Sequence, residues 1–97
     1  MQPDEHKLLK DQERGRLAEE ALQNEILRET FSILRRNYMA AWTVTDTNDV
    51  DGRENLWRCI QILDDVENQM KTVARNGRIA RKQIEQIAQK FKPRVVR

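Results

Sequence analysis

The sequence predicts an all-α fold: an antiparallel helical hairpin of two long helices, followed by a shorter basic C-terminal helix. Three observations lead to this prediction. Apolar residues recur three and four positions apart along most of the chain, as on one face of a helix. The 97 residues include only three Gly and two Pro, so we expect few, long elements within one domain. Hydrophobic residues make up 38% and charged residues 35%, which leaves little for a self-contained core, so we expect oligomerisation to complete it.

Along the chain we distinguish an N-terminal segment at 1–16, a helical domain at 17–92 and a basic tail at 93–97. The N-terminal segment is highly charged and offers only Leu8 and Leu9 for apolar contact. Gly15 lowers helix propensity by about 1 kcal/mol relative to Ala, and we expect it to interrupt a helix there. We therefore predict that this segment is frayed, or becomes ordered only with a partner.

The first long helix is predicted from about Leu17 to Trp42. Five residues within it follow a 4-3-4-3 spacing, which forms one packing seam on a helix: Leu27, Phe31, Leu34, Tyr38 and Ala41. The polar and β-branched stretch at 43–52 then breaks this pattern. Residues of these types favour turns, so we expect a loop there.

The second helix is predicted to begin near Asp51. Asp51 and Glu54 have the three-residue spacing of a capping box, in which each side chain accepts a hydrogen bond from a free backbone N–H. The inner face of this helix is expected to consist of Leu56, Ile60, Leu63, Val66, Met70 and Val73.

Asn76-Gly77 is expected to stop the second helix, because Gly readily adopts the left-handed conformation that closes many helices. A third, shorter helix is then predicted from Arg78 or Ile79 to about Phe91, and Pro93 should end it. This last helix could fold back on the hairpin or extend from it.

The acidic loop resembles a calcium-binding loop only superficially. With Gly52 at position six of an EF-hand, Arg58 would occupy position twelve, where a bidentate carboxylate is needed. With Asp46 at position one, Asp51 would stand where the loop requires Gly. Both registers fail, so we predict a solvated turn and no metal ligands.

No residue pattern indicates catalysis. His6 is the only histidine and Cys59 the only cysteine, so neither has a partner for a nucleophilic or metal site. Asp64 and Asp65 are adjacent on a helix and diverge by about 100°, which keeps them from sharing one site. Cys59 is expected to be a small, buried or half-buried hydrophobe. We predict no enzyme, no catalytic residue and no cofactor.

Three aromatic residues are candidate hydrophobic anchors: Tyr38, Trp42 and Trp57. The two Trp residues flank the predicted loop, and large aromatic side chains there would close the end of the hairpin as buried anchors. The alternative is a contact site for another protein, since Trp, Tyr and Arg dominate such sites. The helical spacing favours the first interpretation and leaves the second open.

Charge is distributed very unevenly along a chain whose net charge is only +2. Residues 1–43 carry −1, residues 44–70 carry −5 and residues 71–97 carry +8. Such asymmetry indicates binding partners more than a fold. The candidate partner-binding residues are Arg75, Arg78, Arg81, Lys82, Lys90, Lys92, Arg94 and Arg97. Arg75, Arg78 and Lys82 would share one face if the helix continued through Asn76-Gly77.

The stretch GRENLWRCIQILDDVENQM at 52–70, followed by NGRIARKQIEQI at 76–87, resembles small helical proteins of tailed bacteriophages and prophages. The resemblance covers about residues 22–90 and centres on Leu56-Trp57 after an acidic helix cap. It implies a context of virion assembly or DNA packaging, in which a basic C-terminal helix is similar to the docking element of a scaffold-like or packaging-associated protein. It carries no established activity onto these residues.

We therefore predict a non-catalytic binding or assembly protein of phage type. Its basic C-terminal helix would dock on an acidic protein surface or on another copy of the chain. The alternatives are a nucleic-acid-binding regulator and a phage-encoded inhibitor of a host protein, which would use the acidic region at 46–67. No apolar run reaches the roughly 20 residues of a membrane span, so we expect a cytoplasmic protein or one within the virion.

Overall fold

The computed structural model describes residues 4–91, and these residues form three helices: α1 (Glu5–Gln23), α2 (Glu25–Val44) and α3 (Val50–Lys90). Within these residues there is no strand, so the predicted all-α class is confirmed. The molecule is elongated, with extents of 78 × 30 × 19 Å. Lys92, Arg94 and Arg97, with the rest of the predicted tail, lie outside the described residues.

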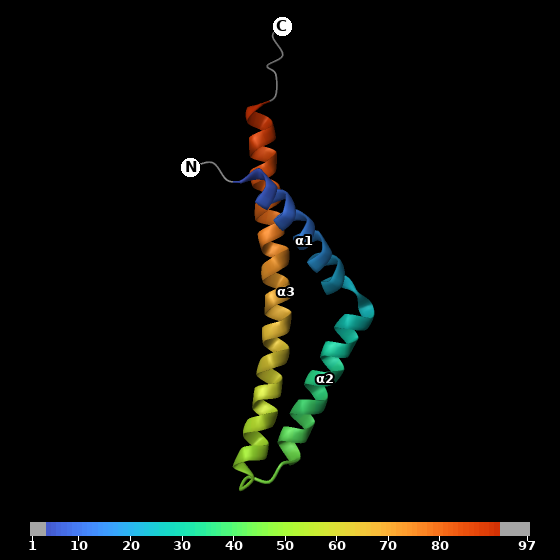
Figure 1. The fold of residues 1–97 in the computed structure, drawn as a ribbon. Coiled ribbons are helices and arrows are strands. Elements are labelled where there is room, and N and C mark those ends of the chain that lie inside the picture. The colour runs from blue at the N-terminus through green and yellow to red at the C-terminus, as the bar shows by residue number, and fades with distance from the viewer. Residues whose placement is uncertain (1–3, 92–97) are drawn as a thin grey trace.

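Figure 1 shows α2 and α3 running in opposite directions from the short connection at 45–49. The chain bends between α1 and α2, at Asn24. Figure 1 shows α1 crossing the C-terminal half of α3. The joint between α1 and α2 therefore lies away from α3, whereas the start of α1 and the end of α2 lie close to α3 (Figure 1). The two shorter helices both pack against α3, which is 41 residues long.

Each helix begins at a residue whose side chain accepts a hydrogen bond from a free N–H of the first turn. Asp4 accepts from the backbone N–H of His6 at 3.0 Å, and Asn24 accepts from that of Leu27 at 2.9 Å. Asp49 accepts from that of Gly52 at 3.0 Å and caps α3. The predicted cap at Asp51 is therefore wrong by two residues, and Glu54 instead pairs with Arg58 one turn later.

The predicted helix boundaries are wrong at three places along the chain. The first helix was expected from Leu17 onward, but α1 continues through Gly15, and the break falls at Asn24. Asn76-Gly77 does not end a helix, because α3 runs through it without interruption. A separate third helix is therefore absent from residues 4–91. The two helices of the hairpin, α2 and α3, have 20 and 41 residues.

The buried apolar residues are few and lie mainly on α3. They are Leu8 on α1, with Ile60, Leu63, Ala74 and Ala80 on α3. No residue of α2 is buried, although its predicted seam of Leu27, Phe31, Leu34, Tyr38 and Ala41 is half-buried. Cys59 is also half-buried, as predicted. The chain thus holds its helices together with a narrow core and leaves much apolar surface uncovered.

Among residues 4–91, no helix combines the length and the apolar character needed to cross a membrane.

Candidate interaction surface

Gly15 and Gly77, the two glycines expected to interrupt helices, meet where α1 crosses α3. A β-carbon placed on Gly77 would lie 2.5 Å from the α-carbon of Gly15 and 3.1 Å from the carbonyl oxygen of Asp11. Ala74 and Ala80 flank Gly77 one turn away on either side, and each is 2% exposed. These small residues let the two backbones approach closely. The helix propensity lost at each glycine is offset by this packing.

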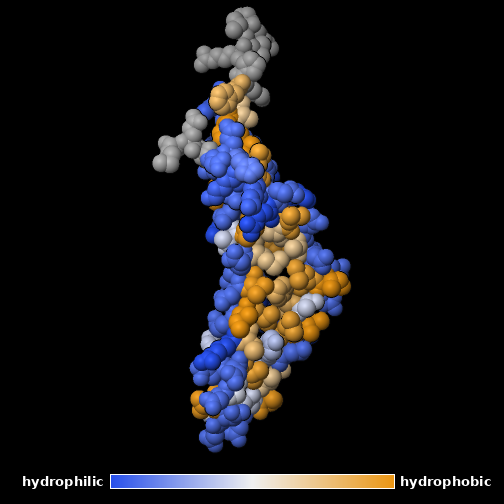
Figure 2. Space-filling view, in the orientation of Figure 1, coloured by the Kyte–Doolittle hydropathy of each residue, from blue (hydrophilic) through white to orange (hydrophobic). Residues whose placement is uncertain are grey.

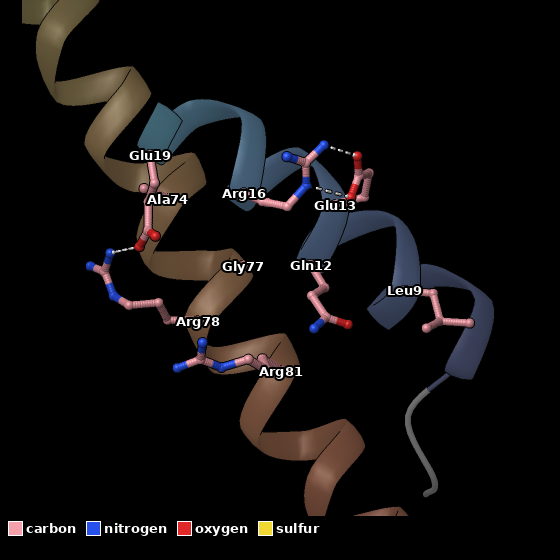
Figure 3. A pocket seen from close by; sticks show the side chains of 10 residues that line it. Leu9, Gln12, Glu13, Arg16, Glu19, Ala74, Gly77, Arg78 and Arg81 are labelled. Atoms are coloured by element: carbon pink, nitrogen blue, oxygen red, sulfur yellow. Dashed lines mark hydrogen bonds and ion pairs between the residues drawn. The ribbon is translucent and has the colours of Figure 1, made fainter. Parts of the chain in front are cut away.

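Ion pairs surround the crossing. Arg78 of α3 donates to the carboxylate of Glu19 on α1, which joins the two helices beside the glycines (Figure 3). Arg16 donates to Glu13 at 2.7 Å and to Glu20 at 3.3 Å along α1. The hydrogen bond from Arg16 lowers the pKa of the Glu13 carboxyl below its usual value. An open groove of about 340 Å³ lies between these side chains.

A second ionic contact joins α2 to α3. The guanidinium of Arg35 donates to Asp64 at 2.9 Å and to Glu67 at 3.0 Å. Both hydrogen bonds raise the pKa of Arg35 above its ordinary value, and the bond to Glu67 has the larger effect. All three side chains are only partly exposed. The contact fixes the level at which the two antiparallel helices face each other.

The aromatic residues at the loop differ in their surroundings. The guanidinium of Arg53 lies 4.0 Å from the centroid of the Trp42 ring, in a cation–π contact. Arg53 also donates to the carbonyl oxygen of Thr45 at 3.2 Å, so it ties the start of α3 to the end of α2. Trp57 is 53% exposed, so the expectation that it is a buried anchor is wrong. Tyr38 and Trp42 are half-buried.

The continuous α3 brings four basic residues onto one side of the helix. Lys71, Arg75, Arg78 and Lys82 are spaced 4-3-4, fall within an arc of about 60°, and are all exposed. We call these four residues the basic stripe. It faces away from Gly77 and Ala80, which pack toward α1. Among residues 4–91, Arg78 alone of these four forms an ion pair, with Glu19.

The other predicted basic residues do not join the basic stripe. Arg81 lies 4.0 Å from Glu85 on its own helix and also lines the groove beside Gly77. Lys90 is exposed at the last residue of α3. Lys71 is not among the partner-binding residues expected from the sequence. Its four-residue spacing from Arg75 is a local signal, but the face that both share with Arg78 and Lys82 requires a helix that continues past Asn76.

No group of three or more His, Cys, Asp or Glu side chains within residues 4–91 is arranged to hold a metal ion. Comparison with protein-family models, with curated proteins and with solved structures finds no match to this chain. The phage context therefore stays a prediction.

Proposed function

We propose that this chain is a non-catalytic binding or assembly protein of phage type that docks on an acidic protein surface through the basic stripe on α3. The observation that carries the proposal is the exposed row of Lys71, Arg75 and Lys82 on an uninterrupted helix. Within the described part of the chain, 4–91, these three side chains form no ion pair, whereas Arg78 and Arg81 are paired with Glu19 and Glu85. A virion or a packaging complex assembled in the host cytoplasm would supply the partner.

A rigid row of cations favours association with a surface of opposite charge, because it raises the association rate and fixes orientation. The stripe spans 12 residues, or about 16 Å of helix between Lys71 and Lys82, which matches a short acidic patch. Association through exposed charges is weakened by salt. Self-association is also part of the proposal, since the core of the single chain is narrow.

The test compares two triple variants with the same change in net charge. Lys71→Glu/Arg75→Glu/Lys82→Glu reverses the stripe but leaves Arg78 and its contact with Glu19 in place. Lys7→Glu/Lys10→Glu/Arg14→Glu is the matched control, on exposed positions of α1. The probe is a labelled Glu-rich peptide of about 20 residues, measured by fluorescence anisotropy at low and at physiological salt.

We expect the wild-type chain and the control to bind this peptide, and the stripe variant to lose binding while its helical circular dichroism is unchanged. Equal binding by both triple variants would show that net charge alone is responsible, and would contradict docking through the stripe.

The second candidate is a nucleic-acid-binding regulator, and the same row of cations favours it. The spacing of the stripe would let it neutralise about three or four phosphates, and such binding falls steeply with salt. A labelled DNA duplex of about 20 base pairs distinguishes the two candidates. Duplex binding that is lost in the stripe variant and retained in the α1 control, with no binding to the acidic peptide, would replace the first candidate by the second.

A further inference from the structure

A second line of residues runs along α2 beside its packing seam, and it carries no charge. Its members are spaced 4-3-4-3-4 and are exposed: Ile26, Thr30, Ile33, Asn37, Ala40 and Val44. A matching line on the first half of α3 is spaced 4-3-4: Asn55, Cys59, Ile62 and Val66. In a chain with 35% charged residues, ten such positions without a charge are unexpected for a solvated surface. We call these ten residues the uncharged face.

Both lines lie on the same side of the molecule. One groove between α2 and α3 is lined by Arg28, Ser32 and Arg35 together with Lys71. On α2, the uncharged line and the residues Arg28, Ser32 and Arg35 lie on opposite sides of the packing seam. On α3, Val66 lies about 140° around the helix from Lys71. The uncharged face is therefore opposite this groove. Figure 2 shows apolar surface gathered below α1, over α2 and the adjacent part of α3.

The two lines are also aligned along the helices. The contact between Arg35 and Asp64 sets the relative level of α2 and α3. The two helices are antiparallel (Figure 1). Counting along both helices from this contact therefore puts Ile33 level with Val66, and Val44 level with Asn55. The free part of the face ends at the 45–49 connection on one side. On the other side it ends at α1, whose Asp11 and Arg14 lie beside Gln69 and Val73.

We propose that a second copy of this chain covers the uncharged face, forming an antiparallel homodimer in which α2 packs on α2 and α3 on α3. On both helices the uncharged residues are spaced three and four positions apart, as in the interface of a helix bundle. A twofold-symmetric dimer needs a patch that complements itself, and two lines of equal spacing at the same level meet this condition. Asn37 and Asn55 within the face would restrict its register.

The position of α1 selects the antiparallel orientation. Since α1 projects from the same side of α3, a parallel dimer would bring two copies of α1 into one space. In the antiparallel dimer each α1 lies beyond the partner's 45–49 connection.

The size of the face fits a specific but moderate interface. It is about 27 Å long on α2, about 16 Å long on α3 and about 20 Å wide. Two copies would bury on the order of 1,000 Å² in total, which is the lower end for specific protein interfaces. The basic stripe points away from the uncharged face, so dimerisation leaves it open, and this inference does not depend on the proposed docking.

The first test is sedimentation equilibrium of the wild-type chain and two variants of α2 at about 100 µM, where interfaces of this size associate. Ile33→Glu introduces a charge in the face, at a residue that is 40% exposed in the single chain. Met39→Glu is the matched control, at a residue of α2 that is 47% exposed on the other side.

We expect a dimer for the wild-type chain and for Met39→Glu. Ile33→Glu should weaken dimerisation at least about tenfold, because it buries a charge in each copy, and should keep the same helicity. A wild-type chain that is monomeric at this concentration, or an Ile33→Glu variant that dimerises normally, would overturn the proposal and leave the face for a different protein.

The second test measures orientation by disulfide formation. Asn55→Cys and Val66→Cys are prepared separately, each with Cys59→Ser. Two antiparallel copies of α3 would bring residue 55 of one copy near residue 66 of the other, while within one helix these residues are about 16 Å apart. Mixing the two variants under mild oxidation should therefore give a covalent dimer that neither forms alone. Cross-linking of each variant with itself would contradict the antiparallel arrangement.

Discussion

The backbones of Gly15 and Gly77 are in direct contact where α1 crosses α3, and a β-carbon on either residue would overlap the other. This contact explains two glycines in the interior of helices, where each lowers helix propensity by about 1 kcal/mol. It also holds α1 against the part of α3 that carries the basic stripe.

Replacing Gly77 with Ala tests this contact through the sign of the stability change. A solvated helical Gly→Ala change stabilises by roughly 1 kcal/mol, whereas overpacking at a crossing costs typically 1–3 kcal/mol. We expect Gly77→Ala to lower the free energy of unfolding in urea. The exposed neighbour Asn76 supplies the control, since Asn76→Ala should be neutral or slightly stabilising. A stabilised Gly77→Ala variant would show that the two backbones are not in contact.

Asn24 separates α1 from α2, and its side chain caps α2 through the backbone N–H of Leu27. We expect Asn24→Ala to lower the free energy of unfolding by about 1 kcal/mol, because that N–H loses its acceptor. Asn24→Asp keeps an acceptor at the same position and should be nearly neutral. An Ala variant with increased helicity and unchanged stability would mean that α1 and α2 can join into one helix at no cost.

Arg35 joins α2 to α3 through Asp64 and Glu67. These side chains are partly exposed, so we expect Arg35→Gln to destabilise by no more than about 1 kcal/mol. The loss should shrink in 1 M salt, where the Debye length falls to about 3 Å. Arg36, the exposed neighbour, provides the matched control in Arg36→Gln. The contact makes no ionic contribution if the two variants have equal stability at low salt.

The hydrogen bond from Arg16 lowers the pKa of Glu13, which has a consequence for α1 at acid pH. A carboxyl with a lowered pKa stabilises the folded chain above its unfolded pKa, and this contribution is lost as the pH falls through the lowered value. An NMR titration of the Glu13 side chain should therefore give a pKa below that of an unperturbed glutamate in the wild-type chain. The pKa should rise in Arg16→Gln. An identical Glu13 titration in both proteins would rule out this ion pair in solution.

The helical content could be predicted from the sequence, but the helix ends could not. The 4-3-4-3 seam of α2 and the spacing from Leu56 to Val73 are local periodic signals, and both are helical in the structure. Gly77 carries the same local signal whether it closes a helix or packs against another backbone. The difference depends on Gly15, which lies 62 positions away in the sequence. Local propensity was therefore overruled by a tertiary contact.

The candidate surface was predictable only in its charge. The basic residues after Lys71 were evident from composition, and the sharing of one face by Arg75, Arg78 and Lys82 was expected on condition that the helix continued. The pairing of Arg78 with Glu19 could not be predicted, since the two residues meet only because α1 crosses α3 at the glycines. The break at Asn24 did have a local signal, because Asn is a preferred helix cap.

The continuity of α3 through Asn76-Gly77 is the central claim, because the basic stripe exists as one face only if the helix does not break there. We would measure it with spin labels at Gln61 and Gln89, both exposed, in a Cys59→Ser chain diluted with unlabelled protein. The 28 intervening steps of an uninterrupted helix predict a single distance of about 42 Å between the labelled backbones. A distribution centred well below about 30 Å would mean that the helix breaks and folds back at Gly77, and would contradict the stripe and the function proposed from it.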